Sequence, residues 1–148
     1  MERILVGVDG SASSLRAVDF AADLASKYNA ELIVLTVVPH FWPQVDSAVE
    51  EYARLEHIPG PATELVRTTA DNLLDKARKK AHAKGATRIS AEPSFGNPAQ
   101  EIIAAAKDRQ ADLIVVGSRG HGRLTGLLLG SVAQKVISLA HCPVVVVR

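Results

Sequence analysis

Short apolar segments alternate with longer segments of helical periodicity along this chain. The clearest apolar segments are Ile4–Val8, Leu32–Val38, Leu113–Gly117 and Val144–Val147. A strand with one face in water alternates apolar and polar residues, whereas a strand covered on both faces is apolar at nearly every position. The pattern therefore predicts the buried strands of a parallel sheet, and Thr87–Phe95 is expected to add one more strand.

Helical spacing of apolar residues predicts helices between these strands. The first has Ser13 as its N-cap and ends at Asn29. The second is expected to begin at the capping residue Thr63 and to end at Lys84–Gly85, where a basic turn precedes a glycine. A third begins at Pro98, because proline suits the first turn of a helix. The residues expected on one face of the second helix are Leu65, Val66, Thr69, Leu73, Ala77 and Ala81.

A fourth helix over Ser131–Ala140 completes a strict alternation of strands and helices. Right-handed crossovers place the helices of such a chain on both faces of a parallel sheet. We therefore expect an α/β fold in one domain over residues 1–148. In this class, ligands bind beyond the carboxyl ends of the strands. Asp9 and Gly117 each lie at such an end, so they are predicted to share a site.

The segment Pro39–Pro61 has the weakest pattern in the chain. Three of its residues, Val45, Val49 and Leu55, fit a short amphipathic helix together with Tyr52.

Charge and composition exclude several classes of function. The formal net charge of +1 provides no general attraction to nucleic acid or to an anionic membrane. The start Met1-Glu2-Arg3 leads directly into a strand, no apolar segment is long enough to span a bilayer, and Cys142 is the single cysteine. We therefore expect a cytoplasmic protein without a nucleic-acid or membrane partner.

A glycine-rich, cationic segment follows the strand that ends at Gly117. Gly117, Gly120 and Gly130-Ser131 are spaced by two and then nine residues, and Ser131 begins a predicted helix. Backbone N–H groups at a helix N-terminus bind phosphate well, and glycine lets a ligand approach the backbone closely. The alternative is a flexible surface loop with solubilising charges. Because the segment lies between a strand and a helix, phosphate binding is the favoured interpretation.

Two common nucleotide motifs are absent from the chain. No Gly-Lys-Ser/Thr occurs, which excludes a Walker A loop, and no Gly-x-Gly-x-x-Gly follows the first strand. The histidines lack the spacing of metal ligands, so no metal site is expected. No set of residues has the pattern of a catalytic site, and no catalytic residue is assigned. Asp9 could also serve only to close a turn or to support the first helix.

These features together resemble the universal stress protein family, and in particular its ATP-binding signature. The resemblance rests on Ile4–Ser11, on the glycines of Gly117–Ser131 and on Cys142–Val147. It covers the chain apart from Pro39–Pro61. It implies an open five-stranded parallel sheet in the order 3-2-1-4-5, with Asp9 and Gly117 on adjacent strands.

The resemblance also implies a role for each residue of the site. Asp9 would bind the nucleoside end of ATP, and Val116 and Gly117 would flank the ribose. The backbone around the adenine would come from Gly7, Val8 and Val37. Gly120 would allow the loop to pass close to the phosphates. The N–H groups at the phosphates would come from Gly130, Ser131 and Val132. Arg119 and His121 are further candidates that the motif does not require.

The expected function is therefore binding of ATP, with Mg²⁺ on its phosphates, by a stress-response sensor or regulator. AMP and cyclic AMP are possible ligands too. The resemblance implies a homodimer through Val144–Val147, although burial in a monomer would also explain these valines. One alternative is an enzyme that hydrolyses ATP slowly or phosphorylates itself on Ser131 or Thr125. Another is a dimeric interaction module that needs no nucleotide.

Overall fold

The computed structural model describes residues 1–39, 61–120 and 128–148, with only the backbone at 61–63. The short helix expected around Val49 and the candidates His121 and Thr125 lie outside the described residues.

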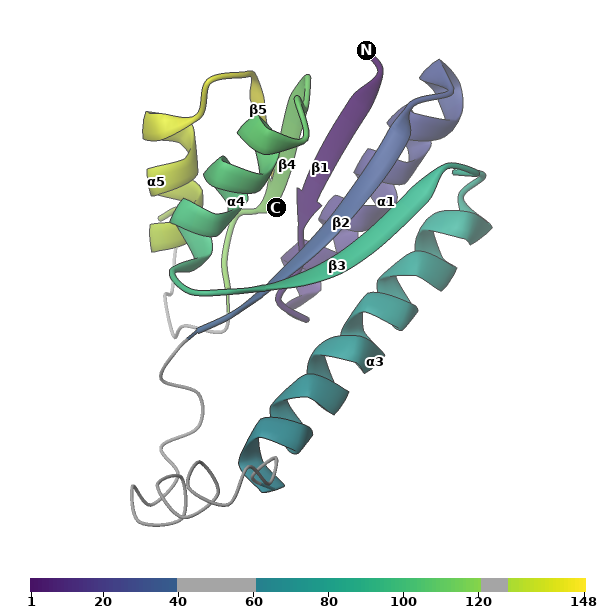
Figure 1. Cartoon of the computed structure of the whole chain (residues 1–148). Helices are drawn as coiled ribbons and strands as arrows, with labels where there is room; N and C mark the ends of the chain where they lie inside the picture. Colours follow the sequence, from purple (N-terminus) through teal and green to yellow (C-terminus); the bar gives the residue numbers. More distant parts are fainter. Residues whose placement is uncertain (40–60, 121–127) are drawn as a thin grey trace.

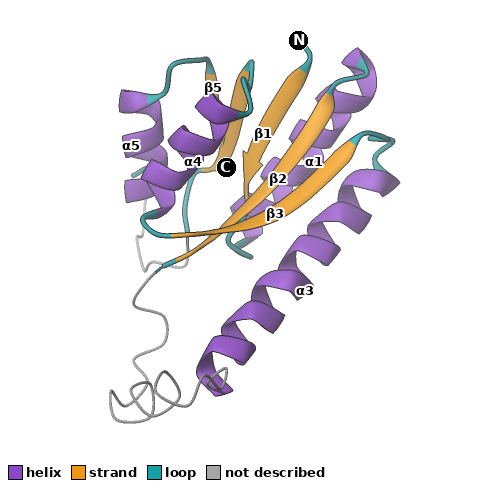
Figure 2. Ribbon diagram, in the orientation of Figure 1, coloured by secondary structure: helices purple, strands orange, loops and turns teal. Residues whose placement is uncertain are grey.

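The strands form one five-stranded parallel sheet in the order β3-β2-β1-β4-β5 (Figure 2). They are β1 (Arg3–Gly7), β2 (Glu31–Val38), β3 (Ile89–Phe95), β4 (Leu113–Gly117) and β5 (Val144–Val147). The predicted fold class and strand order are confirmed, and the predicted boundaries differ by only one or two residues. The chain runs outward from β1 to β3 and then crosses back to β4. Neighbouring strands β1 and β4 therefore form the switch point of the sheet.

Helices cover both faces of the sheet, as predicted (Figure 1). One face carries α1 (Ala12–Tyr28) and α3 (Pro61–Ala83), and the other carries α4 (Pro98–Asp108) and α5 (Ser131–Leu139). Successive strand residues enter opposite layers: Ile4 and Val6 pack toward α1 and α3, whereas Leu5 packs toward α4 and α5. All three are fully buried, which explains why the central strands are apolar at consecutive positions.

The first helix begins differently from the prediction. Ser11 is the N-cap of α1 and accepts a hydrogen bond from the N–H of Ser14 at 3.3 Å. The prediction of Ser13 as the cap is wrong, because the chain already has helical geometry at Ala12. The predicted end at Asn29 is confirmed, and this residue has the left-handed conformation typical of a helix C-terminus.

The second predicted helix, α3, also begins earlier than expected. It starts at Pro61, so Thr63 lies inside its first turn and is not the cap. Its buried positions are Ala70, Leu74, Ala77 and Ala81. The predicted face was therefore correct at Ala77 and Ala81 but wrong at Leu65, which is 63% exposed, and at Thr69, which is also exposed. Small residues on the inner face allow α3 to lie close to the sheet.

The end of α3 and the ends of α4 and α5 follow the predictions closely. Gly85, just beyond α3, has φ +95°, a conformation that favours glycine. Pro98 occupies the first turn of α4, behind Asn97, whose side chain accepts the N–H of Gln100. Helix α5 begins at Ser131 as predicted and ends one residue earlier, at Leu139.

The two edges of the sheet differ in whether another strand could pair with them. Two hydrogen bonds show which backbone groups at β3 face β2: the N–H of Leu32 donates to the carbonyl of Arg88, and the N–H of Gly96 donates to the carbonyl of Val38. The N–H and C=O groups of even-numbered residues in β3 therefore point toward β2. Pro93, which has no N–H, therefore faces the open edge, where a proline obstructs pairing. In β5, Pro143 and Val147 accept bonds from β4, so Val144 and Val146 present their backbone groups to the open edge.

Candidate functional site

A cavity of about 270 Å³ opens at the carboxyl ends of β1, β2 and β4, at the switch point of the sheet. It lies between these strand ends and the first turns of α4 and α5. All predicted site residues line it: Gly7, Val8, Asp9, Val37, Val116, Gly117, Arg119, Gly120, Gly130, Ser131 and Val132. The fold thus brings together residues that are more than a hundred positions apart in the chain. Their roles toward a ligand stay predictions.

The cavity has further lining residues that the sequence analysis did not identify. They are Ser14, Leu35, Pro98, Ile102 and Ala133. The sequence does not show which strand end Ile102 approaches. That information depends on where α4 crosses the sheet.

The half of the cavity next to β2 and α4 is apolar. Leu35, Val37 and Val116 come from the strand ends, and Ile102 comes from α4. A Cβ atom at Gly7 would lie 2.9 Å from Cδ1 of Ile102, so a larger residue in β1 would displace this helix side chain. The glycine therefore allows α4 to pack close to β1. The apolar lining can accept a flat, uncharged ring.

The opposite half of the cavity is formed by glycines and the N-terminus of α5. Gly130 is the N-cap of this helix, with no side chain to cap it. Among the described residues, no group accepts a hydrogen bond from the N–H of Ser131, Val132 or Ala133. These N–H groups and the helix dipole favour an anion at this end.

The N–H of Gly130 has a partner within the protein. It donates to the carbonyl oxygen of Ser118 at 2.7 Å. We expected Gly130 to offer this N–H to a phosphate, and the structure corrects that expectation. A Cβ atom at Gly130 would lie 3.3 Å from the carbonyl oxygen of Ser118 and 3.4 Å from Cα of Arg119, so glycine allows the loop to pack closely against the start of α5. The available donors begin at Ser131.

Gly117 is required by the packing of α1 against the end of β4. A Cβ atom there would lie 2.6 Å from Oγ of Ser13 and 2.7 Å from the backbone nitrogen of Ser14. The backbone cannot move away without shifting the helix start. This glycine of the motif therefore supports the site through close packing in addition to lining the cavity.

Asp9 lies at the border between the first strand and the glycine loop. Its Oδ1 accepts the N–H of Ser11 at 2.8 Å, so it closes the turn before α1. Its Oδ2 would lie only 2.9 Å from a Cβ atom at Gly120. The carboxylate is therefore beside the glycine loop. It is the one carboxylate among the described residues that line the cavity.

Within the described ranges, no group of three or more His, Cys, Asp and Glu side chains could hold a metal ion. None of the helices in these ranges is long and apolar enough to cross a membrane.

Comparison with known proteins agrees with the resemblance noted in the sequence. The sequence pattern of the universal stress protein family matches residues 1–148. The chain belongs to the universal stress protein family. Universal stress protein YxiE of Bacillus subtilis is 38% identical over 148 residues, which cover 99% of this chain and 98% of the relative. Universal stress protein MJ0531 of Methanocaldococcus jannaschii is 37% identical, over 99% of this chain and 82% of its own.

Solved universal stress protein structures have the same fold. UspA from Lactobacillus plantarum superimposes with a TM-score of 0.82 at 26% identity, covering 99% of this chain and 97% of its own. Another universal stress protein, crystallised in complex with cAMP, has a TM-score of 0.69 at 33% identity, with 99% and 96% coverage. A member of the family at this level of identity therefore binds a nucleotide.

Proposed function

We propose that this universal stress protein binds an adenine nucleotide in the cavity and acts as a nucleotide-dependent regulator of a stress response. ATP with Mg²⁺ is the ligand that we put forward first. The observation that carries the proposal is the division of one cavity into two halves of different chemistry. An apolar half beside Ile102 suits a base, and the half at the N-terminus of α5 suits phosphates.

Each half has a defined set of groups for its part of the ligand. The adenine would lie against Val37 and Ile102, and Asp9 would accept a hydrogen bond from the nucleoside. The phosphates would accept hydrogen bonds from the N–H groups of Ser131 and Val132, and the Ser131 hydroxyl would be a further donor. In this scheme Gly130 allows the loop to lie close to the start of α5.

The lining residues also fit a magnesium ion brought by the nucleotide. Mg²⁺ in nucleotide sites takes most of its ligands from phosphates and water, with one or two carboxylates from the protein. Asp9, the one carboxylate among the described residues that line the cavity, is assigned to the nucleoside, so Mg²⁺ would take its ligands from the phosphates and water. The ion would neutralise phosphate charge.

AMP and cyclic AMP are alternative ligands for the same cavity. The complex of a related protein with cAMP supports a ligand with a single phosphate as well. Parallel calorimetric titrations with MgATP, AMP and cyclic AMP would rank them.

The first test is titration of MgATP into nucleotide-free protein and into Gly130→Asp. Gly130 has φ −63° and ψ 158°, the extended geometry of an N-cap, which aspartate adopts readily. The added Cβ would lie 3.3 Å from the carbonyl oxygen of Ser118, so the loop must shift by a few tenths of an ångström. The aspartate carboxylate would accept hydrogen bonds from the same N–H groups that we assign to the phosphates. Its negative charge would also repel the phosphates. We expect affinity to fall at least about a hundredfold while the fold is retained.

Lys135→Gln is the matched control for this test, because it makes the same change in net charge on an exposed residue of α5. Thermal unfolding of each variant monitors the fold. Equal MgATP binding by the wild type and Gly130→Asp would reject the site. No binding by folded wild type would favour the interaction module that needs no nucleotide.

A slow enzyme is the second candidate function, because Ser131 is exposed and lines the cavity at the start of α5. Its hydroxyl would accept the terminal phosphoryl group of ATP and release ADP. Intact-mass measurement after incubation with MgATP, with Ser131→Ala as control, tests this function. An added phosphate in the wild type alone would support it, and unmodified wild type without motif-dependent ADP would count against it.

We further propose that two copies associate through β5. Val144 and Val146 present their backbone groups at this edge, where no other described strand pairs with β5, and Ile137 and Leu139 of neighbouring α5 are exposed. Val146→Pro would remove an outward N–H, as Pro93 does at the opposite edge, and is expected to convert dimers to monomers in sedimentation analysis. Val146→Thr keeps the N–H and should remain dimeric. A monomeric wild type at tens of micromolar would reject this assembly. The cytoplasmic location stays a prediction.

A further inference from the structure

Ser13 is a buried polar residue whose hydroxyl bonds outside its own helix. It is 6% exposed and lies in the first turn of α1. Its hydroxyl donates to the carbonyl oxygen of Arg119 at 2.7 Å, and its Oγ accepts the N–H of the same residue at 3.3 Å. One side chain therefore satisfies both backbone groups of a loop residue located 106 positions away in the chain.

The loop is held at adjacent positions by different elements. The N–H of Ser118 donates to Val147 at the end of β5, and its carbonyl accepts from Gly130 at the start of α5, both at 2.7 Å. Ser13 then holds Arg119 from α1, with Ser11 as a second donor to the Arg119 carbonyl at 3.2 Å. Gly120, the next residue, lines the cavity.

The contact with Ser13 determines the direction of the peptide between Arg119 and Gly120. In a trans peptide, the C=O and the following N–H point in opposite directions. Because the carbonyl of Arg119 points toward α1, the N–H of Gly120 points away from it. No described residue accepts that N–H. A ligand on the cavity side can therefore accept a hydrogen bond from the N–H of Gly120.

Glycine at position 120 makes the opposite peptide orientation accessible as well. Rotation of this peptide changes φ of residue 120, and glycine tolerates both signs of φ. The rotated peptide would direct the carbonyl oxygen of Arg119 away from α1, where it would repel an anion. The side chain of Ser13 opposes this rotation by holding the carbonyl.

We propose that Ser13 is a positioning residue for the phosphate groups of the ligand, acting by holding the Arg119–Gly120 peptide in the orientation that donates to an anion. This inference rests on the proposed nucleotide binding. It assigns a role to a residue that lies outside the glycine motif and does not line the cavity.

The test compares ligands that share a base but differ in phosphate. MgATP and adenosine are titrated into the wild type, Ser13→Ala and Ser13→Thr, with Ser138→Ala as the control. Ser138 donates only to the carbonyl of Gln134 in its own helix, so this variant loses a serine hydroxyl at a distance from the loop. We expect Ser13→Ala to weaken MgATP binding about tenfold, the effect of one charge-assisted hydrogen bond, and to leave adenosine binding within about twofold. Ser13→Thr keeps the hydroxyl and is expected to retain most of the MgATP affinity.

An NMR measurement on the ligand-free proteins reports the peptide directly. The distance from Hα of Arg119 to the amide proton of Gly120 changes when the peptide rotates, so Ser13→Ala should alter this nuclear Overhauser effect and Ser138→Ala should not. Equal losses of MgATP and adenosine affinity, or no change in either, would overturn the role of Ser13. If the wild type bound neither ligand, the proposed function would fail together with this inference.

Discussion

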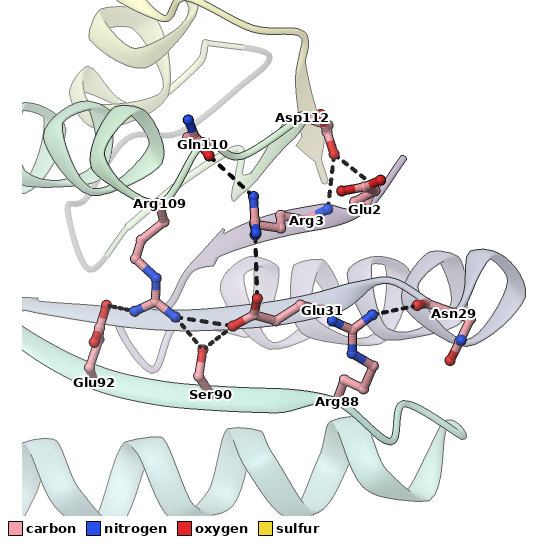
Figure 3. A network of polar contacts seen from close by, with 10 residues as sticks. All are labelled: Glu2, Arg3, Asn29, Glu31, Arg88, Ser90, Glu92, Arg109, Gln110 and Asp112. Atoms are coloured by element: carbon pink, nitrogen blue, oxygen red, sulfur yellow. Dashed lines mark hydrogen bonds and ion pairs between the residues drawn. The ribbon is translucent and has the colours of Figure 1, made fainter.

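At the amino end of the sheet, charged side chains bind one another, whereas at the carboxyl end glycines and a helix N-terminus leave backbone N–H groups beside a cavity. Arg109, which follows α4, contacts Glu31 at 3.0 Å and Glu92 at 2.9 Å (Figure 3). Arg3 adds a second contact to Glu31 at 3.6 Å. These side chains join the starts of β1 and β2 to β3 and α4.

The comparison shows how one sheet separates stability from binding. At the amino end, opposite charges already satisfy one another and offer little to a ligand. At the carboxyl end, Gly117 and Gly130 allow backbone segments to pack closely around the cavity, and donors of α5 have no partner among the described residues. Because all strands are parallel, every strand contributes its amino end to one side and its carboxyl end to the other.

Gly117→Ala should have the largest effect, because it damages both packing and the candidate site. The added Cβ would meet backbone atoms of Ser13 and Ser14 within 2.8 Å, and these cannot rotate away as a flexible side chain would. We expect a loss of about 2–3 kcal/mol in the free energy of unfolding, measured with urea. MgATP affinity should fall as well.

Gly120→Ala is the matched control, since among the described residues its Cβ would meet a side-chain oxygen of Asp9 and no backbone atom. Its stability should stay close to that of the wild type. Equal stability of Gly117→Ala and wild type would contradict the close-packing role of Gly117.

Arg109→Ala should test whether the two ends of the sheet act independently, because it removes two ion pairs at the amino end and does not alter a residue of the cavity. The side chain is 34% exposed, so solvent screening limits the loss to about 1–2 kcal/mol in the free energy of unfolding. Affinity for MgATP should not change. Lys79→Ala, which breaks an exposed pair with Asp75, should leave stability unchanged. A fall in nucleotide affinity in Arg109→Ala would show that the two ends are coupled.

Asp112→Asn should have the smallest effect, visible in its pH dependence. The Asp112 carboxylate accepts the N–H groups of Glu2 at 2.6 Å and Arg3 at 2.9 Å, and these bonds hold its pKa below the usual value. A carboxyl whose pKa is lower in the folded state stabilises the fold above its unfolded pKa. The stability difference from the wild type should therefore be full at pH 7, begin to fall near pH 4 and be lost as the pH passes below the folded pKa.

Urea midpoints across this pH range measure the difference, with exposed Asp108→Asn as the control. A stability difference between Asp112→Asn and the wild type that grew in acid would have the opposite sign to the one expected. Such a difference would have to arise from a titratable group other than Asp112.

Several contacts of the candidate site could not have been predicted from local sequence. The glycine spacing and the strand ends indicated the lining of the cavity, and every predicted residue that the structure describes lies there. Ser13 was interpreted as a helix cap because a serine before an apolar helix usually is one. Its actual partner, Arg119, depends on α1 and β4 lying side by side. The N–H of Gly130 was assigned to a ligand because nothing in the sequence indicates that Ser118 approaches it.

The sequence by itself determined the parallel α/β fold and the position of the glycine loop. Consecutive apolar residues need cover on both faces of a strand, and turns and caps depend on residues close together in the chain. The tertiary structure alone decided which donors face the cavity, that Pro93 obstructs one edge while β5 stays open, and that charged residues close the amino end. Each of these depends on how distant segments align, and hydrophobic periodicity specifies which face a residue occupies but not which partner it meets there.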